Sequence, residues 1–122
     1  MSKKILLVCD DNEKSEVLSS ALANSGYDTT SLSDSSDLVN KSVEVNPDMI
    51  IMDINIPIKD GYKICRDLKE TPDTQHIKVI FVKNDNNPLE KAWSVVKGAD
   101  FYFATKNPFS ENNLIQSMSV LN

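Results

Sequence analysis

Three aspartates follow two apolar runs of strand length in this chain. Asp53 ends the run at residues 49–52, and Asp10 and Asp11 follow the run at residues 5–8. If both runs are parallel strands of one open α/β sheet, their carboxyl ends lie on the same edge, where such sheets place their ligand sites. Grouped carboxylates resist ionisation together unless a cation lies among them. The spacing therefore predicts a shared pocket for a hard divalent cation, with Mg²⁺ as the default.

An aspartate beside such a cation can attack a phosphoryl group and carry it as an acyl phosphate. Each acid also has a purely structural interpretation. Asp53 can cap a strand-to-loop turn, and Asp10 and Asp11 can cap the helix that follows them. Three acids at two strand ends together favour the metal and phosphoryl chemistry over three separate caps.

Length and charge limit the classes of function. The chain has 122 residues, of which 40% are hydrophobic and 25% charged, as in a single globular domain. The net charge of -5 argues against direct binding to nucleic acid, because a phosphate backbone requires a basic face. The apolar run at 5–8 is too short for a signal peptide or a membrane span, so we expect a cytoplasmic protein without membrane contact.

Cysteine and histidine offer no second chemistry. Cys9, Cys65 and the single His76 lack the spacing of a zinc site or of a disulfide framework. Both cysteines are therefore expected to be reduced and at least half-buried.

Strand-length runs alternate with segments of helical period, which predicts βα units and a parallel α/β sheet. The expected strands are residues 5–8, 27–32, 49–52, 79–82 and 101–103. Five helices are expected between and after them: one ending at Gly26, one starting after Asp34 or Ser35 and stopping before Pro47, and others at about 62–69, after Pro88 and at 110–120. The apolar faces predicted for the first three helices are Val17, Leu18, Leu22 and Ala23; Leu38, Val39 and Val43; and Ile64, Cys65 and Leu68.

Three short motifs occur in order along the chain. Residues 53–62 combine Asp53 with Pro57 and the pair Asp60-Gly61, residues 98–100 precede Tyr102, and residues 106–109 read Lys-Asn-Pro-Phe. These motifs resemble the phosphoacceptor loop, the start of the fifth strand and the Lys-Pro-Phe motif of response regulator receiver domains. The resemblance covers residues 1–122 as one receiver domain. It implies a doubly wound, five-stranded parallel sheet with flavodoxin-like (βα)5 topology.

The resemblance also implies roles for individual residues. Asp53 would accept a phosphoryl group, and Asp10, Asp53 and the backbone carbonyl of Asn55 would hold Mg²⁺, with Asp11 as a further candidate ligand. Lys106 would neutralise the phosphoryl group. Gly61 would occupy a turn that favours positive φ.

Partners follow from the same resemblance. A histidine kinase or a phosphotransfer protein would supply the phosphoryl group, and the fourth helix, fifth strand and fifth helix would select a downstream protein through a population shift. Tyr102 stands at the position of the family's rotating aromatic, although it also suits an ordinary core. Trp93 is a candidate anchor on the output side, with partial burial as its alternative. The domain is expected to act as a signalling module and not as an enzyme.

Three positions depart from the family pattern. Cys9 stands where the family has the first of two acids, and a thiol suits Mg²⁺ poorly. Lys83 stands where a Ser or Thr hydroxyl would bond the acyl phosphate; its ammonium can pair with Asp53 or extend into solvent. The stretch from Ala99 to Lys106 is one residue longer than the family pattern, and Asn107 separates Lys106 from Pro108. Either Thr105 or Lys106 could therefore stand at the family's lysine position.

These departures leave alternatives open. A one-residue slip of the first strand would restore an Asp10-Asp11 pair, but it would turn each side chain to the opposite face, and we prefer the register without the slip. The domain can be a phosphorylated receiver or a pseudo-receiver that binds partners without phosphorylation. An aspartate-nucleophile phosphatase is disfavoured, because Asn55 stands where its second aspartate is required.

Overall fold

A computed structural model describes residues 3–53, 58–83, 101–104 and 115. Its centre is a five-stranded sheet in the order β2-β1-β3-β4-β5, and every neighbouring pair is parallel. The strands are β1 (Lys4–Cys9), β2 (Asp28–Leu32), β3 (Met49–Asp53), β4 (Lys78–Lys83) and β5 (Phe101–Ala104). The predicted doubly wound parallel sheet is confirmed, and each predicted strand lies within about two residues of an observed one.

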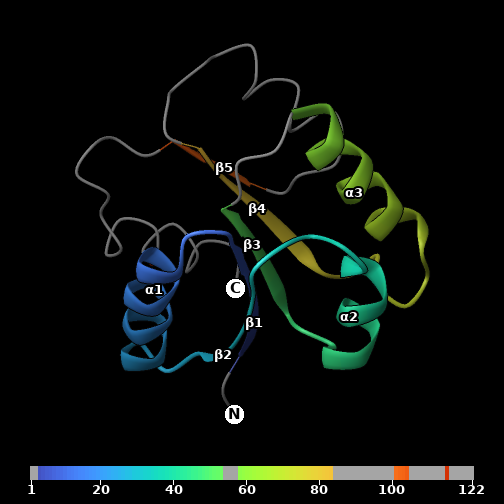
Figure 1. Ribbon diagram of the computed structural model, residues 1–122. Coiled ribbons are helices and arrows are strands. Elements are labelled where there is room, and N and C mark those ends of the chain that lie inside the picture. Colours follow the sequence, from blue (N-terminus) through green and yellow to red (C-terminus); the bar gives the residue numbers. More distant parts are fainter. Residues whose placement is uncertain (1–2, 54–57, 84–100, 105–114, 116–122) are drawn as a thin grey trace.

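Helices cover both faces of this sheet (Figure 1). One cluster of buried side chains, which we call the α1-side cluster, joins Ile5, Leu7 and Cys9 of β1 to Leu18 and Leu22 of α1 (Asn12–Asn24). The alternate β1 residues belong to a second cluster, which α2 (Leu38–Val45) and α3 (Ile58–Glu70) complete from the opposite face. Burial on both faces explains why β1, β3 and β4 are apolar in unbroken runs.

The buried face of α1 is narrower than predicted. Leu18 and Leu22 are fully buried, but Val17 is 53% exposed and Ala23 is exposed as well. Adjacent helical residues point about 100° apart, so a stripe centred on positions 18 and 22 turns position 17 toward solvent. The predicted end of the helix is confirmed, since Gly26 has a φ of +94°, a left-handed conformation that glycine adopts without strain.

The helix α2 begins later than predicted. The carboxylate of Asp34 accepts hydrogen bonds from the Ser36 amide, at 2.9 Å, and from the Ser36 hydroxyl, which forms a turn in place of a first helical turn. Asp37 then has a left-handed φ of 59° before the helix starts. The helix ends at Val45, and the left-handed Asn46 separates it from Pro47, which confirms the predicted stop.

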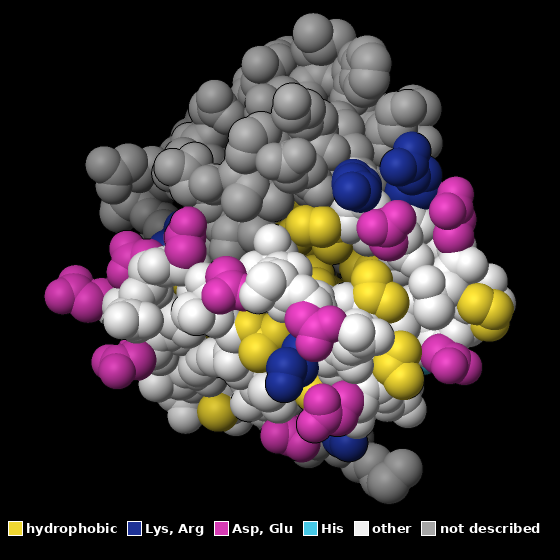
Figure 2. Space-filling view, turned by 45° about the vertical axis from the view of Figure 1, so that its right-hand side comes forward, with side chains coloured by type: hydrophobic (Ala, Val, Ile, Leu, Met, Phe, Trp, Pro, Cys, Tyr) yellow, Lys and Arg dark blue, Asp and Glu magenta, His cyan; other side chains and the backbone are white. Residues whose placement is uncertain are grey.

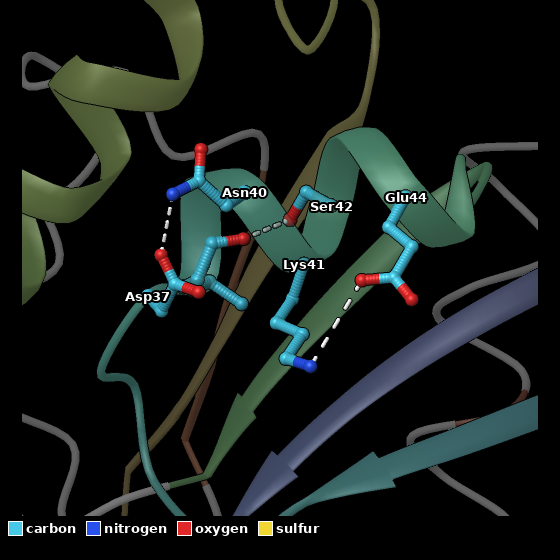
Figure 3. A network of polar contacts seen from close by, with 6 residues as sticks. Asp37, Asn40, Lys41, Ser42 and Glu44 are labelled. Carbon is cyan, nitrogen blue, oxygen red and sulfur yellow. Dashed lines mark hydrogen bonds and ion pairs between the residues drawn. The ribbon is translucent and has the colours of Figure 1, made fainter.

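The packing face of α2 also differs from the prediction. Leu38 is buried and Val39 is partly buried, but Val43 is 43% exposed. Ser42 is buried instead, because its hydroxyl donates to the Leu38 carbonyl at 2.7 Å and is thereby satisfied inside the core (Figure 3).

The helix α3 begins four residues earlier than predicted. Asp60 and Gly61 therefore lie in its first turns, and the predicted positive-φ turn at Gly61 is wrong, because helical residues have negative φ. Cys65 and Leu68 are buried and Ile64 is partly buried, as predicted. The helix ends at Glu70, where the Thr71 hydroxyl donates to the Asp67 carbonyl at 2.8 Å.

The helices predicted after Pro88 and at 110–120 fall outside the described residues, apart from Ile115, which is helical and packs against the α1-side cluster. Within the described part of the chain, no helix combines the length and the hydropathy of a membrane span. Figure 2 shows the α2 and α3 side of the molecule, where acidic side chains are spread among hydrophobic and a few basic ones. The described part of that face therefore lacks the continuous basic stripe of a nucleic-acid surface.

Candidate functional site

The ends of β1 and β3 lie side by side. Cys9 is the register partner of Asp53, one step beyond the pair Val8 and Met52. Asp10 follows Cys9 directly, so the backbone brings Asp10 and Asp53 to the same carboxyl edge of the sheet. Cys9, and not Asp10, is thus the strand residue beside Asp53, which supports the register without a slip.

Cys9 belongs to the protein core. Its side chain is 2% exposed and packs in the α1-side cluster. Its thiol also donates to the backbone carbonyl of Asp11, with 3.5 Å between sulfur and oxygen. A buried thiol in this position adds no charge to the site and offers no oxygen ligand to a metal.

Asp11 is the N-cap of α1. Its carboxylate oxygen Oδ1 accepts hydrogen bonds from the amides of Glu13, at 3.1 Å, and Lys14, at 3.2 Å. Its backbone carbonyl accepts the Ser15 amide at 2.8 Å. The capping role that we considered for Asp11 is therefore correct, since its carboxylate satisfies two amides at the start of the helix.

Asp10 lies in the bend between β1 and α1 and is exposed. An exposed carboxylate at the strand end suits a hydrated divalent cation, because Mg²⁺ keeps several waters and binds through one or two carboxylates. Among the described residues, no group of three or more His, Cys, Asp or Glu is arranged to hold a metal. Within the described part of the chain, a metal held by Asp10 and Asp53 would therefore complete its coordination with water and backbone oxygens.

The ends of β4 and β5 lie on the same edge. Lys83 is the last residue of β4 and the register partner of Ala104, the last residue of β5. Two residues earlier on the same two strands, Tyr102 is the register partner of Phe81. The structure thus brings the backbone of Cys9, Asp10, Asp53 and Lys83 to one edge. The remaining predicted site residues lie outside the described residues: Asn55, Pro57, Trp93, Thr105 and Lys106.

The profile of the response regulator receiver domain matches residues 5–119 of the chain. The chain belongs to the response regulator receiver family.

Curated relatives of this receiver domain include the response regulator protein GraR of two staphylococci. The Staphylococcus saprophyticus protein is 32% identical over 117 residues, which are 96% of this chain and 50% of that protein. The Staphylococcus haemolyticus protein is 29% identical over 118 residues, which are 97% of this chain and 50% of that protein. The chain spans about half the length of these relatives.

Solved structures of the same fold include the chemotaxis protein CheY4 of Vibrio cholerae, with a TM-score of 0.86, 20% identity and complete coverage of both chains. The signal receiver domain of a histidine kinase from Syntrophus aciditrophicus has a TM-score of 0.80 and 31% identity over 98% of this chain and 89% of that one. This chain is therefore a receiver domain of two-component signalling.

Proposed function

We propose that this receiver domain accepts a phosphoryl group on Asp53 and that phosphorylation changes its affinity for a downstream protein. The register of β1 and β3 carries the proposal, because it brings Asp53 and Asp10 to one edge of the sheet. The proposed phosphodonor is a histidine kinase or a phosphotransfer protein. We expect this phosphoryl transfer to take place in the cytoplasm. In this role the domain is an acceptor in a relay and not a turnover enzyme.

Mg²⁺ fits the oxygen donors of the site, although only two carboxylates, those of Asp10 and Asp53, would hold it. Asp10 and Asp53 supply hard oxygen ligands, and the carbonyl of Asn55 is the proposed third ligand. The buried, neutral thiol of Cys9 explains why we expect weak binding. When bound, the ion would neutralise negative charge on the phosphoryl oxygens and on the acids. A receiver domain of a Pseudomonas aeruginosa sensor histidine kinase, 24% identical, has a magnesium ion coordinated in its active-site cleft.

In the proposed step, a carboxylate oxygen of Asp53 attacks the phosphorus of a phosphohistidine. The new P–O bond forms as the P–N bond breaks, and the departing imidazole nitrogen takes up a proton. Lys106 would then pair with the acyl phosphate. Lys83 offers an ammonium in place of a hydroxyl at the end of β4, so we expect the response to phosphorylation to differ from that of a Ser or Thr receiver.

A pseudo-receiver, which binds partners without phosphorylation, is the second candidate function. Cys9 favours this function, because a buried thiol in place of an acid leaves the site with one carboxylate fewer than the family pattern. In both cases the proposed output surface is the fourth helix, fifth strand and fifth helix, with Tyr102 and Trp93 as candidate switch and anchor residues.

Intact-mass measurement tests the first function against the second. The protein is incubated with Mg²⁺ and a small-molecule phosphodonor, with Asp53→Asn as the control. We expect one added phosphoryl group that is absent from the Asp53→Asn variant and reduced in Asp10→Asn. A wild-type mass that does not change at any Mg²⁺ concentration would reject the acceptor role and leave the pseudo-receiver.

A further inference from the structure

The thiol of Cys9 connects the core to the loop that carries Asp10. It lies 2% exposed in the α1-side cluster, and it donates to the Asp11 carbonyl two residues further on. Asp10 is the residue enclosed between the donor and the acceptor. A hydrogen bond that spans two residues in this way restricts the backbone dihedral angles of the residue between them.

The far side of the loop is anchored as well. The Asp11 carboxylate caps α1 through the Glu13 and Lys14 amides, and the same Asp11 carbonyl accepts the Ser15 amide at 2.8 Å. Asp10 is thereby held between a strand buried in the core and the first turn of a helix. Its exposed carboxylate has a fixed backbone on both sides, which lowers the entropy lost when it binds a ligand.

An acid at position 9 could not make the same contact. An ionised carboxylate has no hydrogen to donate to a carbonyl, and its burial in the α1-side cluster would be unfavourable. A thiol can do both, because it packs as a small hydrophobic group and is also a weak donor. The departure from the family pattern therefore removes one acid from the site but adds a donor to the loop.

We propose that Cys9 is a positioning residue, which fixes the β1–α1 loop so that Asp10 is presented to a divalent cation at the end of β1. This inference rests on the proposed function, in which Asp10 is a metal ligand. Cys9 itself does not bind the cation.

Three substitutions at position 9 and one control test this role. Cys9→Ser retains a donor, Cys9→Ala removes it, and Cys9→Val removes it while keeping the site apolar. Cys65→Ala is the matched control, because Cys65 is the other buried cysteine and lies on the opposite face of the sheet. Affinity for Mg²⁺ is measured by titration, and amide hydrogen exchange of Glu13, Lys14 and Ser15 reports on the loop directly.

We expect Cys9→Ala and Cys9→Val to weaken Mg²⁺ binding by about two- to tenfold, the range given by the loss of one hydrogen bond. The exchange of the three amides should rise in both variants. Cys9→Ser should restore both readouts, and Cys65→Ala should alter neither, even where it lowers the melting temperature. Rescue by serine separates a donor from a packing role, because serine fills the core less well than valine.

The outcomes separate this inference from the proposed function. If the wild type binds Mg²⁺ and all the Cys9 variants bind it equally well, the positioning role is wrong while the metal site stands. If the wild type binds no Mg²⁺, the metal site is wrong, and the presentation of Asp10 to a cation is wrong with it. Unchanged amide exchange in Cys9→Ala and Cys9→Val overturns the positioning role in either case.

Discussion

Cys9 and Asp53 are register partners at the carboxyl ends of two central parallel strands. A buried thiol thus stands beside the proposed phosphoacceptor, where the receiver pattern has an acid. The neighbouring Asp10 is exposed, while Asp11 is committed to the start of α1. Cys9, Asp10 and Asp11 can be tested separately, because the first is buried, the second is exposed and the third caps a helix.

Substitution of Cys9 by aspartate should place a second carboxylate beside Asp53. Without metal we expect a loss of about 1–3 kcal/mol in the free energy of unfolding, because the new charge is buried next to a like charge and the donor to Asp11 is lost. Mg²⁺ should restore much of this loss by binding the folded state. Thermal unfolding with and without Mg²⁺ measures both effects. Cys9→Asn is the control, and a metal response equal to that of Cys9→Asp would exclude the added charge as the cause.

Substitution of Asp11 should separate capping from metal binding. Asp11→Ala removes the acceptor of the Glu13 and Lys14 amides and should cost about 1 kcal/mol of stability in denaturant unfolding. Asp11→Asn keeps a capping oxygen but removes the charge, so its stability should stay close to that of the wild type. Its Mg²⁺ affinity should also be unchanged. A clear loss of affinity in Asp11→Asn would show that Asp11 is a metal ligand after all.

Substitution of Lys83 by threonine should raise Mg²⁺-dependent labelling of Asp53. A hydroxyl at the end of β4 can bond the acyl phosphate, and removal of the ammonium would end any ion pair that Lys83 makes with Asp53. We expect a gain on the order of tenfold in the initial rate, which corresponds to ~1.4 kcal/mol. Lys78→Thr, at the opposite end of the same strand, serves as the control. Equal or lower labelling in Lys83→Thr would show that Lys83 does not block the site.

Substitution of Ser36 by alanine should raise the pKa of Asp34. The side-chain and backbone hydrogen bonds from Ser36 hold the pKa of Asp34 below its ordinary value of 3.8. A carboxyl pKa lowered in the folded state stabilises the turn above the ordinary pKa, and this stabilisation is lost as the pH falls through the folded-state pKa. Titration of the Asp34 carboxyl by NMR measures the shift. Ser33→Ala is the control, and equal midpoints in the two variants would contradict this origin of the shift.

The strands were predictable from sequence because β1, β3 and β4 are buried on both faces and are therefore apolar without interruption. Helix boundaries were less predictable. Asp34 and Ser35 have the composition of an N-cap, but the hydrogen bonds from Ser36 to Asp34 form a turn, and the left-handed Asp37 precedes the actual start. Nothing in the hydrophobic period indicates either of these local interactions.

In the candidate site, too, the placement of residues by the strands was predictable from sequence, and the hydrogen bonds of a single turn were not. The shared edge of Asp10 and Asp53 follows from the parallel order of the strands, which the sequence predicts well. The choice of Asp11 as the capping residue, and the hydrogen bond from Cys9 to its carbonyl, depend on backbone geometry at a single turn. A sequence pattern offers several residues for such a role, and only the structure selects one.

The two left-handed residues that enclose α2 bear on how the folded state opens. The Asp37 side chain caps no amide of the helix; its carboxylate instead accepts a hydrogen bond from the Asn40 side-chain amide, at 2.6 Å (Figure 3). The helix has 8 residues, fewer than the ~12–15 that an isolated helix requires in water. Its order therefore depends on the anchoring of Leu38 and Ser42 in the core. Among the described helices, local unfolding should reach α2 before α1, so the amides of α2 should exchange with solvent before those of α1, and a protease should cleave α2 before α1.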